Sequence, residues 1–518
     1  MSVPTKTTVL VVGGGPAGSY AASVLAREGV DVVMLEAEKF PRYHIGESML
    51  ASVRFFLRFI DLEETFDRHG FEKKFGATFK ITGKNPAYTD FSATLGAGGF
   101  SWNVVRSEAD ELLFRHAASN GAQVFDATKV DAIEWEPYPD TGNAFTAEAR
   151  LANPGRPVSA RWSRKDGTSG VVAFDYLVDA SGRNGIVSTK YMKNRRFNER
   201  LKNIANWGYW KGARRFAAGE HNENSPFFEA LDDTGGWVWA IPLHNGTLSV
   251  GVVARQDVFF QRKKESGQDA KSFYKDYLKL APQINALLQH DAELVGDVKQ
   301  ASDWSYSAGA YAGPHFRVIG DAGCFVDPYF SSGMHLAMVG GLAAATSIQA
   351  SRRGQASEAE AAAWHSTKVA EGYTRFLLLV TSVQRQLRLR DSQILTSDDE
   401  DGFDAAFKKI QPVIQGAADT DVEDAQVQKR AAQSVDFALD SFSKTTVVTP
   451  EMQRAVLEKV DGSSDESLTA DEVKILSGIV SRVFEAKHTQ SLDHFTGDVI
   501  NGLAAHVVRG DLGLARKE

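Results

Sequence analysis

A glycine-rich turn between a buried strand and a helix, close to the N-terminus, constrains the fold more than any other feature. Residues 8–12 are apolar, as expected for a strand, and lead directly into Gly13-Gly14-Gly15-Pro16-Ala17-Gly18. Residues 19–27 have the pattern of a helix, and a second apolar run, 30–35, ends in Glu36. This order of strand, glycine fingerprint, helix, strand and terminal acid predicts a dinucleotide-binding unit.

Each part of the fingerprint has a physical role. Gly13 permits the tight turn, Gly15 lets the backbone approach a pyrophosphate, and Gly18 lets the helix pack closely on the strand. The helix N-terminus offers N–H groups and a positive dipole to the phosphates. Glu36 can accept hydrogen bonds from a ribose diol and would repel a 2′-phosphate, which argues against NADP. We therefore predict cofactor contacts from Gly13, Gly14, Gly15, Ala17, Gly18 and Glu36.

The composition excludes several classes of protein. With 518 residues, 43% hydrophobic and 24% charged, the chain can bury a large core and is not disordered. A net charge of −8 gives no basic surface, so we expect no nucleic-acid partner. One cysteine, Cys324, excludes an intrachain disulfide and favours a reducing compartment, so we expect a cytoplasmic protein. We expect no signal peptide and no membrane span, because residues 334–350 are too short an apolar run.

The pattern of the chain divides it into three blocks. Residues 1 to about 190 alternate strand and helix signals, and residues 200–300 are rich in aromatic and β-branched residues, which favours antiparallel sheet. Helical periodicity follows at 356–382, 420–442, 450–460 and 469–486. We predict an α/β fold: a Rossmann-type core in residues 1–355, interleaved with an antiparallel substrate sheet (mainly 70–105 and 200–300), and a helical C-terminal region, 356–518.

Two later segments indicate which dinucleotide binds. Residues 176–183 and 317–323 each form a strand ending in small residues, and both resemble motifs of the FAD-containing aromatic hydroxylase superfamily. The resemblance implies that Asp321 holds the ribityl chain of FAD. It also places Arg106, which leads the predicted helix 107–119, near the flavin. Residues 44–48, with Glu47 and Ser48, resemble the loop that closes over the cofactor.

Residues 235–242 form a predicted strand that carries two tryptophans. Alternation along a strand places Trp237, Trp239 and Ile241 on one face, as a bulky, dry wall. Core packing would explain a single tryptophan at such a position. The spacing Trp-x-Trp-x-Ile-Pro, however, matches the signature of flavin-dependent halogenases.

Residues 325–333 lead from the second of these strands into a helix that starts at Met334. Backbone N–H groups at such a helix start can hold an anion without a charged side chain. Ser332 and Gly333 match the family positions whose backbone amides hold chloride beside the flavin, and Met334 is assigned to the cofactor site. A plain helix cap by a serine side chain is the alternative.

A lysine pair lies in the predicted strand 73–81. Alternation places Lys74 on one face with Gly76, Thr78 and Lys80, whereas Lys73 points away. A lysine in such a strand is most often a solvated charge. The pattern Lys-x-Gly-Ala-x-Phe, however, resembles the segment that carries the essential lysine of the flavin-dependent halogenases, and the match falls on Lys74.

Together these motifs resemble the fungal flavin-dependent phenol halogenases, over most of the chain. The resemblance implies the following chemistry. FADH2, delivered by a separate NAD(P)H-dependent flavin reductase, reacts with O2 to a flavin hydroperoxide, and chloride attacks it to give hypochlorous acid. Lys74 guides this oxidant, by a hydrogen bond or as a chloramine, to a small phenol of a polyketide or meroterpenoid type. Bromide should replace chloride.

One position departs from the pattern of the tryptophan halogenases. They have a glutamate two residues after the proline of the chloride segment, where this chain has Phe330. A phenol activates its own ring when it ionises, so the missing acid favours a phenolic substrate. We therefore predict that Phe330 is an apolar wall of the active site, together with Trp237 and Trp239.

Other interpretations account for fewer of these motifs. An FAD-dependent phenol monooxygenase shares every FAD motif, and the tryptophan pair and Lys74 discriminate against it. A flavin-binding protein without turnover would leave the lysine and anion segments without a role. Residues 461–472 have the oxygen spacing of a calcium loop, but Glu466 occupies the position that requires glycine, so a capped loop is favoured and no metal site is predicted. Cys324 is interpreted as a packed residue.

Overall fold

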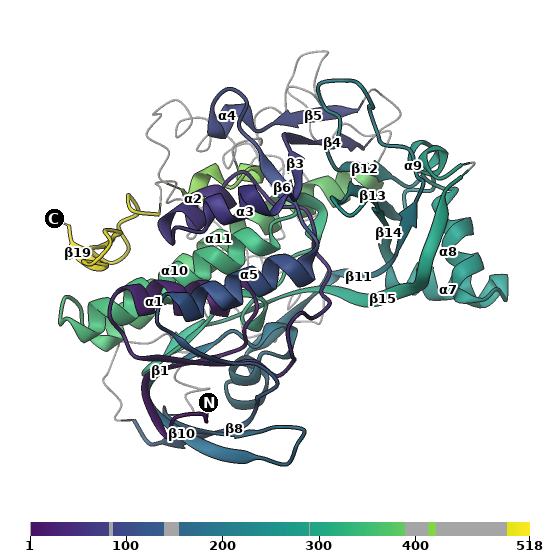
Figure 1. Ribbon diagram of the computed structural model, residues 1–518. Coiled ribbons are helices and arrows are strands. Elements are labelled where there is room, and N and C mark those ends of the chain that lie inside the picture. The colour runs from purple at the N-terminus through teal and green to yellow at the C-terminus, as the bar shows by residue number, and fades with distance from the viewer. Residues whose placement is uncertain are drawn as a thin grey trace, which may run out of the picture.

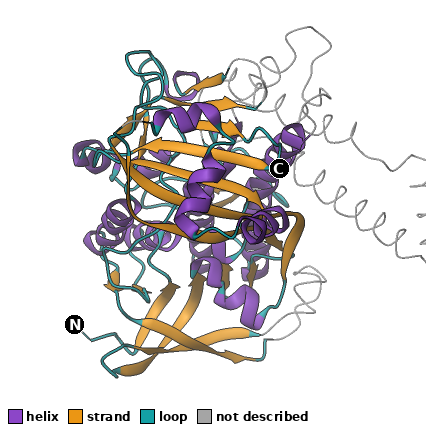
Figure 2. Ribbon diagram, turned by 90° about the vertical axis from the view of Figure 1, so that its right-hand side faces the viewer, coloured by secondary structure: helices purple, strands orange, loops and turns teal. Residues whose placement is uncertain are grey.

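The computed structural model describes residues 2–81, 86–138, 155–289, 291–388, 413–420 and 495–517. Two large sheets and the helices packed on them make up most of the molecule, as Figure 1 shows. Turned by 90°, the molecule shows the two sheets as separate groups of strands, drawn in orange in Figure 2. Among the described residues, no helix has the length and apolar character that crossing a membrane requires.

The first sheet contains the N-terminal strand and confirms the predicted α/β core. Its main path runs β16-β17-β10-β1-β2-β7, and β1 pairs in parallel with both β2 and β10. β8 and β9 extend it through antiparallel pairing with each other and with β10. Its strands are β1 (Lys6–Val12), β2 (Val32–Leu35), β7 (Gln123–Phe125), β8 (Lys129–Glu136), β9 (Arg156–Ser163), β10 (Ser169–Asp179), β16 (Ala312–Gly313) and β17 (Phe316–Val318).

Both faces of this sheet are buried, which explains why its central strands are continuously apolar. Val9 and Val11 belong to one core, together with residues of α1 (Pro16–Arg27), α5 (Arg106–Ser119) and α10 (Gly333–Arg352). Leu10 and Val12, which alternate with them along β1, belong to the core on the opposite face, which β8 and β9 complete. The predicted buried helix at 334–350 is therefore confirmed as α10, whose residues are almost all inaccessible to solvent.

The second sheet has the strand order β15-β11-β14-β13-β12-β4-β5. Its strands are β4 (Gly76–Lys80), β5 (Ala87–Asp90), β11 (Arg195–Lys211), β12 (Phe227–Ala230), β13 (Gly236–Pro242), β14 (Leu248–Arg255) and β15 (Glu293–Ala308). The sheet is mixed, because β12 pairs in parallel with β4 while its other pairs are antiparallel. The prediction of a purely antiparallel sheet missed this pair, which joins segments far apart in the sequence.

The alternation along β13 is as predicted. Trp237, Trp239 and Ile241 belong to one apolar core. Val238 and Ala240 face the other side, where α8 (Ala270–Leu278) and α9 (Pro282–Leu287) cover the sheet. The two tryptophans therefore lie on the face of the sheet away from these helices.

The lysine segment differs from its prediction. The single predicted strand 73–81 is two strands, β3 (Glu72–Lys74) and β4, separated at Phe75. β3 pairs with β6 (Ser101–Asn103) in a small sheet of its own, whereas β4 belongs to the second sheet. Lys74 is buried and Lys73 exposed, so their predicted opposite orientation is confirmed, but Lys74 packs in a different sheet from Thr78 and Lys80.

Further helices are α2 (Val53–Phe59), α3 (Glu63–His69), α4 (Ser92–Leu95) and α7 (Gln256–Ser266). In the C-terminal region, α11 (Glu358–Arg388) covers all but the first two residues of the helix predicted at 356–382. The other three predicted helices, Thr420 excepted, lie outside the described residues, as does the segment 461–472. Near the C-terminus, β18 (Leu503–His506) and β19 (Gly513–Arg516) form a hairpin, where the sequence pattern did not predict strands.

Candidate active site

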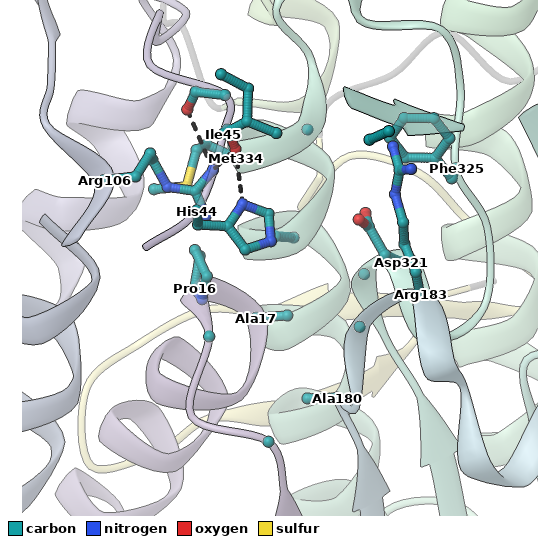
Figure 3. Close-up of a pocket in the computed structure, with 18 of the residues that line it drawn as sticks. Pro16, Ala17, His44, Ile45, Arg106, Ala180, Arg183, Asp321, Phe325 and Met334 are labelled. Carbon is teal, nitrogen blue, oxygen red and sulfur yellow. Dashed lines mark hydrogen bonds between the residues drawn. The ribbon is translucent and has the colours of Figure 1, made fainter. Parts of the chain in front are cut away.

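A cavity of about 530 Å³ runs from the glycine loop of β1–α1 to the tryptophans of β13. Figure 3 shows residues of α1, α5 and α10 and of the loops after β2 and β10 around it. Most of the predicted site residues line this cavity: Gly13, Gly15, Ala17, Glu36, Glu47, Ser48, Arg106, Trp237, Trp239, Asp321, Gly333 and Met334. Those that do not line it are Gly14, Gly18, Lys74, Phe330 and Ser332.

The glycine loop leaves room for a ligand at the start of α1. Gly13 has a φ of 106°, and a Cβ there would lie 2.2 Å from the carbonyl oxygen of Ala180. A Cβ on Gly18 would lie 2.0 Å from the carbonyl oxygen of Gly13, so close packing of helix on strand requires glycine. Gly15 precedes α1, and no side chain caps the backbone N–H groups at the start of this helix. These free donors and the helix dipole fit a pyrophosphate.

Glu36 follows β2 and is held by the loop. Its carboxylate accepts hydrogen bonds from the backbone N–H groups of Gly14 (2.7 Å) and Glu38 (2.8 Å). Gly14 thus contributes by orienting the acid, which itself lines the cavity. The remaining acceptor capacity of the carboxylate fits the hydroxyls of a ribose.

Arg106 holds the loop that borders the middle of the cavity. Its guanidinium donates to both carboxylate oxygens of Asp110 (2.8 and 3.1 Å) and to the carbonyl oxygens of Ile45 (2.8 Å) and Gly46 (3.1 Å). Arg42 also pairs with Asp110, at 3.0 Å. The two arginines hold the pKa of the buried Asp110 carboxyl below its usual value, despite burial. Arg106 is thus fully engaged with the protein as well as lining the cavity.

Asp110 was missed by the sequence analysis, although a signal was present. It follows Arg106 by four residues, and such a pair lies on one face of a helix. The resemblance pointed to the arginine alone.

Asp321 lies on the opposite wall of the cavity, next to Arg183 in Figure 3. Burial raises the pKa of its carboxyl, and the positive charges of Arg183, Arg106 and Arg195 oppose that rise. A carboxylate at this position, beside the cavity and near positive charge, fits the hydroxyls of a ribityl chain. The residues present therefore fit FAD along the length of the cavity.

The far end of the cavity is aromatic. Trp237 and Trp239 line it, with Phe228 from the neighbouring strand and Trp207 from β11. Trp207 was not predicted, because only the pairing of β11 with β14 brings it next to β13. These rings line the cavity from the face of β13 that the alternation predicted, and their role as an active-site wall stays a prediction.

Lys74 lies directly behind the cavity wall. Its Nζ donates to the hydroxyl of Ser48 (2.8 Å) and the carbonyl oxygen of Met49 (2.9 Å), and it lies 4.9 Å from the centre of the Phe91 ring. Only 1% of Lys74 is exposed, and burial lowers the pKa of the amine to about 7. Ser48 lines the cavity and contacts the lysine, so this one side chain separates them.

The start of α10 borders the cavity through Gly333 and Met334. Ser332 precedes the helix, but no side chain caps it, which disfavours the plain helix cap. The hydroxyl of Ser332 is buried and has no hydrogen-bond partner among the described residues. Phe330 does not line the cavity; it packs behind it, with ring centres 5.7 Å from Phe79 and 5.1 Å from Tyr329.

A group of potential metal ligands lies outside the cavity. His69, Glu108 and His244 bring their ligand atoms within 4.8 Å of one another. The Glu108 carboxylate lies 2.7 Å from His69 and 3.2 Å from His244. The Nδ1 atom of His244 is buried and has no hydrogen-bond partner among the described residues. The expectation of no metal site stays a prediction.

These features define a class. An FAD-binding α/β protein has a glycine loop at a helix start, an acid for a ribose, an acid on the opposite wall and a long cavity between two sheets, and this chain has all four features. In agreement, residues 6–373 match the family model described as FAD binding domain.

Comparison with individual proteins narrows this class. The chain is 67% identical to the flavin-dependent halogenase ptaM of Pestalotiopsis fici, over 100% of this chain and 96% of the relative. It is 63% identical to the sulochrin halogenase gedL of Aspergillus terreus, over 100% and 95%. The crystal structure of the flavin-dependent halogenase CmlS has 26% identity and a TM-score of 0.66, covering 93% of this chain and 78% of CmlS. The chain belongs to the flavin-dependent halogenases of fungi and is an enzyme.

Proposed function

We propose that this enzyme chlorinates the ring of a free phenol in a polyketide or meroterpenoid, with Lys74 as the residue that directs the oxidised halogen. FAD, when bound, supplies the oxidising power through its reaction with O2. The observation that carries the proposal is the position of Lys74: a buried amine one side chain behind the flavin cavity. The relative from Aspergillus terreus, named for sulochrin, supports an aromatic substrate.

The chain's own residues then have these roles. The glycine loop and Glu36 hold the nucleotide end, Asp321 holds the ribityl chain, and the tryptophan wall excludes water and bulky substrates from the flavin end. The uncapped N–H groups at Ser332 and Gly333 hold chloride or bromide. Because the pKa of Lys74 is about 7, both ammonium and amine are populated near neutral pH, and the hydrogen-bond and chloramine roles both stay open.

The direct test is incubation of the enzyme with FAD, a flavin reductase, NADH, chloride and a resorcylic phenol. We expect a product whose mass spectrum shows the chlorine isotope pair and whose formation requires every component. A hydroxylated product without chlorine would support the monooxygenase alternative instead.

The purified enzyme alone should oxidise NADH and NADPH only at the background rate. The sequence has one glycine fingerprint, and the cavity beside it is assigned to FAD, so a separate reductase must deliver FADH2. Nicotinamide oxidation can be followed at 340 nm, with and without phenol and reductase. Rapid, phenol-stimulated oxidation without the reductase would contradict the halogenase mechanism.

Gly333→Val should lower halogenation about 10²-fold, the scale for loss of one hydrogen-bond donor to an anion, because the valine side chain would block the halide from the backbone N–H groups. A Cβ on Gly333 meets no protein atom within 4 Å, so the variant can fold without a clash while its side chain fills the cavity. Product formation and FAD binding should be measured together, with Gly333→Ala as the smaller control. If the valine variant binds FAD and halogenates as wild type does, the halide site lies elsewhere.

A further inference from the structure

Halogenation in this cavity requires a proton from solvent. In the proposed reaction, ArH, Cl⁻, O2, H⁺ and FADH2 give ArCl, FAD and two molecules of water. Atoms and charges balance only if one proton enters in each turnover. Aromatic rings line the far end of the cavity, so a chain of hydrogen-bonding side chains that reaches this end from solvent would supply the proton.

Glu47 is a buried acid on the cavity wall with spare acceptor capacity. It is 3% exposed, and its Oε1 accepts a hydrogen bond from the hydroxyl of Tyr209 at 2.6 Å. Its Oε2 has no partner with normal hydrogen-bond geometry among the described residues, although the Ser249 hydroxyl lies close enough to lower the pKa of Glu47. A buried carboxylate oxygen without a partner is costly, so such an atom beside a cavity indicates that a water molecule or a ligand in the cavity bonds to it.

Two tyrosines connect Glu47 to the surface. The hydroxyls of Tyr209 and Tyr43 lie 2.9 Å apart, and Tyr43 is 48% exposed. Since the Tyr209 hydrogen is donated to Glu47, Tyr43 must donate to Tyr209. The indole N–H of Trp207 donates to the Tyr43 oxygen at 2.6 Å, which leaves the Tyr43 hydrogen available for Tyr209. All hydrogens along the chain therefore point from solvent toward the carboxylate.

We propose that Tyr43, Tyr209 and Glu47 form a proton relay that carries protons from solvent to the flavin end of the cavity. The inference rests on the proposed function. The Oε2–H bond of protonated Glu47 breaks as its proton passes to a basic oxygen in the cavity. Tyr209 then gives its proton to Oε1, Tyr43 gives one to Tyr209, and water gives one to Tyr43. Rotation of the carboxyl group and the two hydroxyls restores the starting state.

The charges around the relay suit this role. Burial raises the pKa of Glu47 to about 7, although Tyr209 on β11, Ser249 on β14 and the Arg106 guanidinium on α5 all lower it. Burial also raises the pKa of Tyr43 to about 12 and that of Tyr209 further, so both stay neutral and pass protons without ionising. At the solvent end of the relay, the Lys299 amine on β15 lies 4.4 Å from the Tyr43 ring centre. His44, next to Tyr43 in the loop after β2, has a pKa lowered to about 4 by Arg106 and by burial, so it stays neutral.

Tyr209→Phe is the decisive variant. It keeps the ring and removes the middle hydroxyl, and Tyr209 itself does not line the cavity. We expect halogenation to slow about 10²-fold, the lower end for loss of a proton transfer, with FAD binding unchanged. In wild type the rate should fall as pH rises through about 7, where both Glu47 and Lys74 lose a proton. A shift of this limb in Tyr209→Phe, which does not touch Lys74, assigns it to Glu47. Tyr274→Phe, a buried tyrosine on α8 outside the relay, is the matched control.

A second measurement does not depend on turnover. Infrared difference spectra of the full chain, with and without FAD, should show a protonated carboxyl band that titrates near pH 7 and is absent in Glu47→Gln. A Tyr209→Phe enzyme with the wild-type rate and pH profile, or a spectrum without that band, would overturn the relay. Failure of the proposed function is distinct, because wild type would then give no halogenated product at all.

Discussion

Replacing Lys74 with methionine is expected to lower the rate of halogenation about 10²–10⁴-fold, the range for loss of a positioned proton donor or acceptor. FAD binding and the oxidation of FADH2 by O2 should remain, because Lys74 lies behind Ser48 and outside the cavity that holds the cofactor. The oxidant made at the flavin would then escape as hydrogen peroxide or hypochlorous acid. Chlorinated product and peroxide should be measured side by side, from the same reaction.

Methionine is chosen because it keeps the length of the buried side chain, whereas alanine would leave a cavity beside Ser48. The stability of the variant carries its own expectation. The folded pKa of Lys74, about 7, lies below the value of 10.5 for an unfolded lysine, so burial of the amine destabilises the fold below pH 10.5 and most at pH 7 and below. Removing the amine should therefore raise the free energy of unfolding. The net gain should be roughly 1–3 kcal/mol at pH 7, once the loss of the two hydrogen bonds of the amine is subtracted, and smaller at pH 10.

Lys73→Met is the matched control, since Lys73 is the exposed neighbour on the same strand. It should keep both the halogenation rate and the wild-type stability. Substantial halogenation by Lys74→Met would remove Lys74 from the mechanism. A variant less stable than wild type at every pH would show that the bonds to Ser48 and Met49 outweigh the burial of the amine.

The sequence predicted those parts of the site that depend on short segments. The glycine loop, the acid after β2 and the alternation of Trp237 and Trp239 need only neighbours within one strand or turn, and the structure has them as expected. The break between β3 and β4 at Phe75 could not be predicted from the sequence, because both halves of the segment have a strand pattern. What separates them is the partner, β6 for one and β12 with β5 for the other.

The proton relay depends even more than the lysine segment on contacts between residues far apart in the sequence. Tyr43 and Tyr209 are 166 residues apart, and their contact exists only because β11 passes beside the loop after β2. No local pattern marks a tyrosine in a long strand as part of a chain of hydroxyls. Glu47 was predicted to lie at the cofactor, but its free oxygen is visible only when every neighbouring donor is placed.

The substrate's own hydroxyl should decide whether the enzyme can halogenate the ring. If ring activation comes from the phenolate, the enzyme should halogenate a free phenol and act on its methyl ether roughly 10²–10⁴-fold more slowly, as expected when a coupled proton transfer is lost. The ether cannot ionise, and its oxygen donates far less to the ring. Binding should survive in part, so the loss should fall on kcat and not on KM alone. The two substrates should be compared at saturating and limiting concentrations.

The same two substrates should also be compared in a variant of Phe330, because a glutamate there would imitate the tryptophan halogenases. Phe330 is 2% exposed and packs among Phe79 and Tyr329, so Phe330→Glu would bury an acid without a partner and raise its pKa. We expect it to slow phenol halogenation and lower the melting temperature without helping the ether, whereas Phe330→Leu should keep most activity. Equal rates for phenol and ether in wild type, or an ether made reactive by the glutamate, would show that the protein and not the phenolate activates the ring.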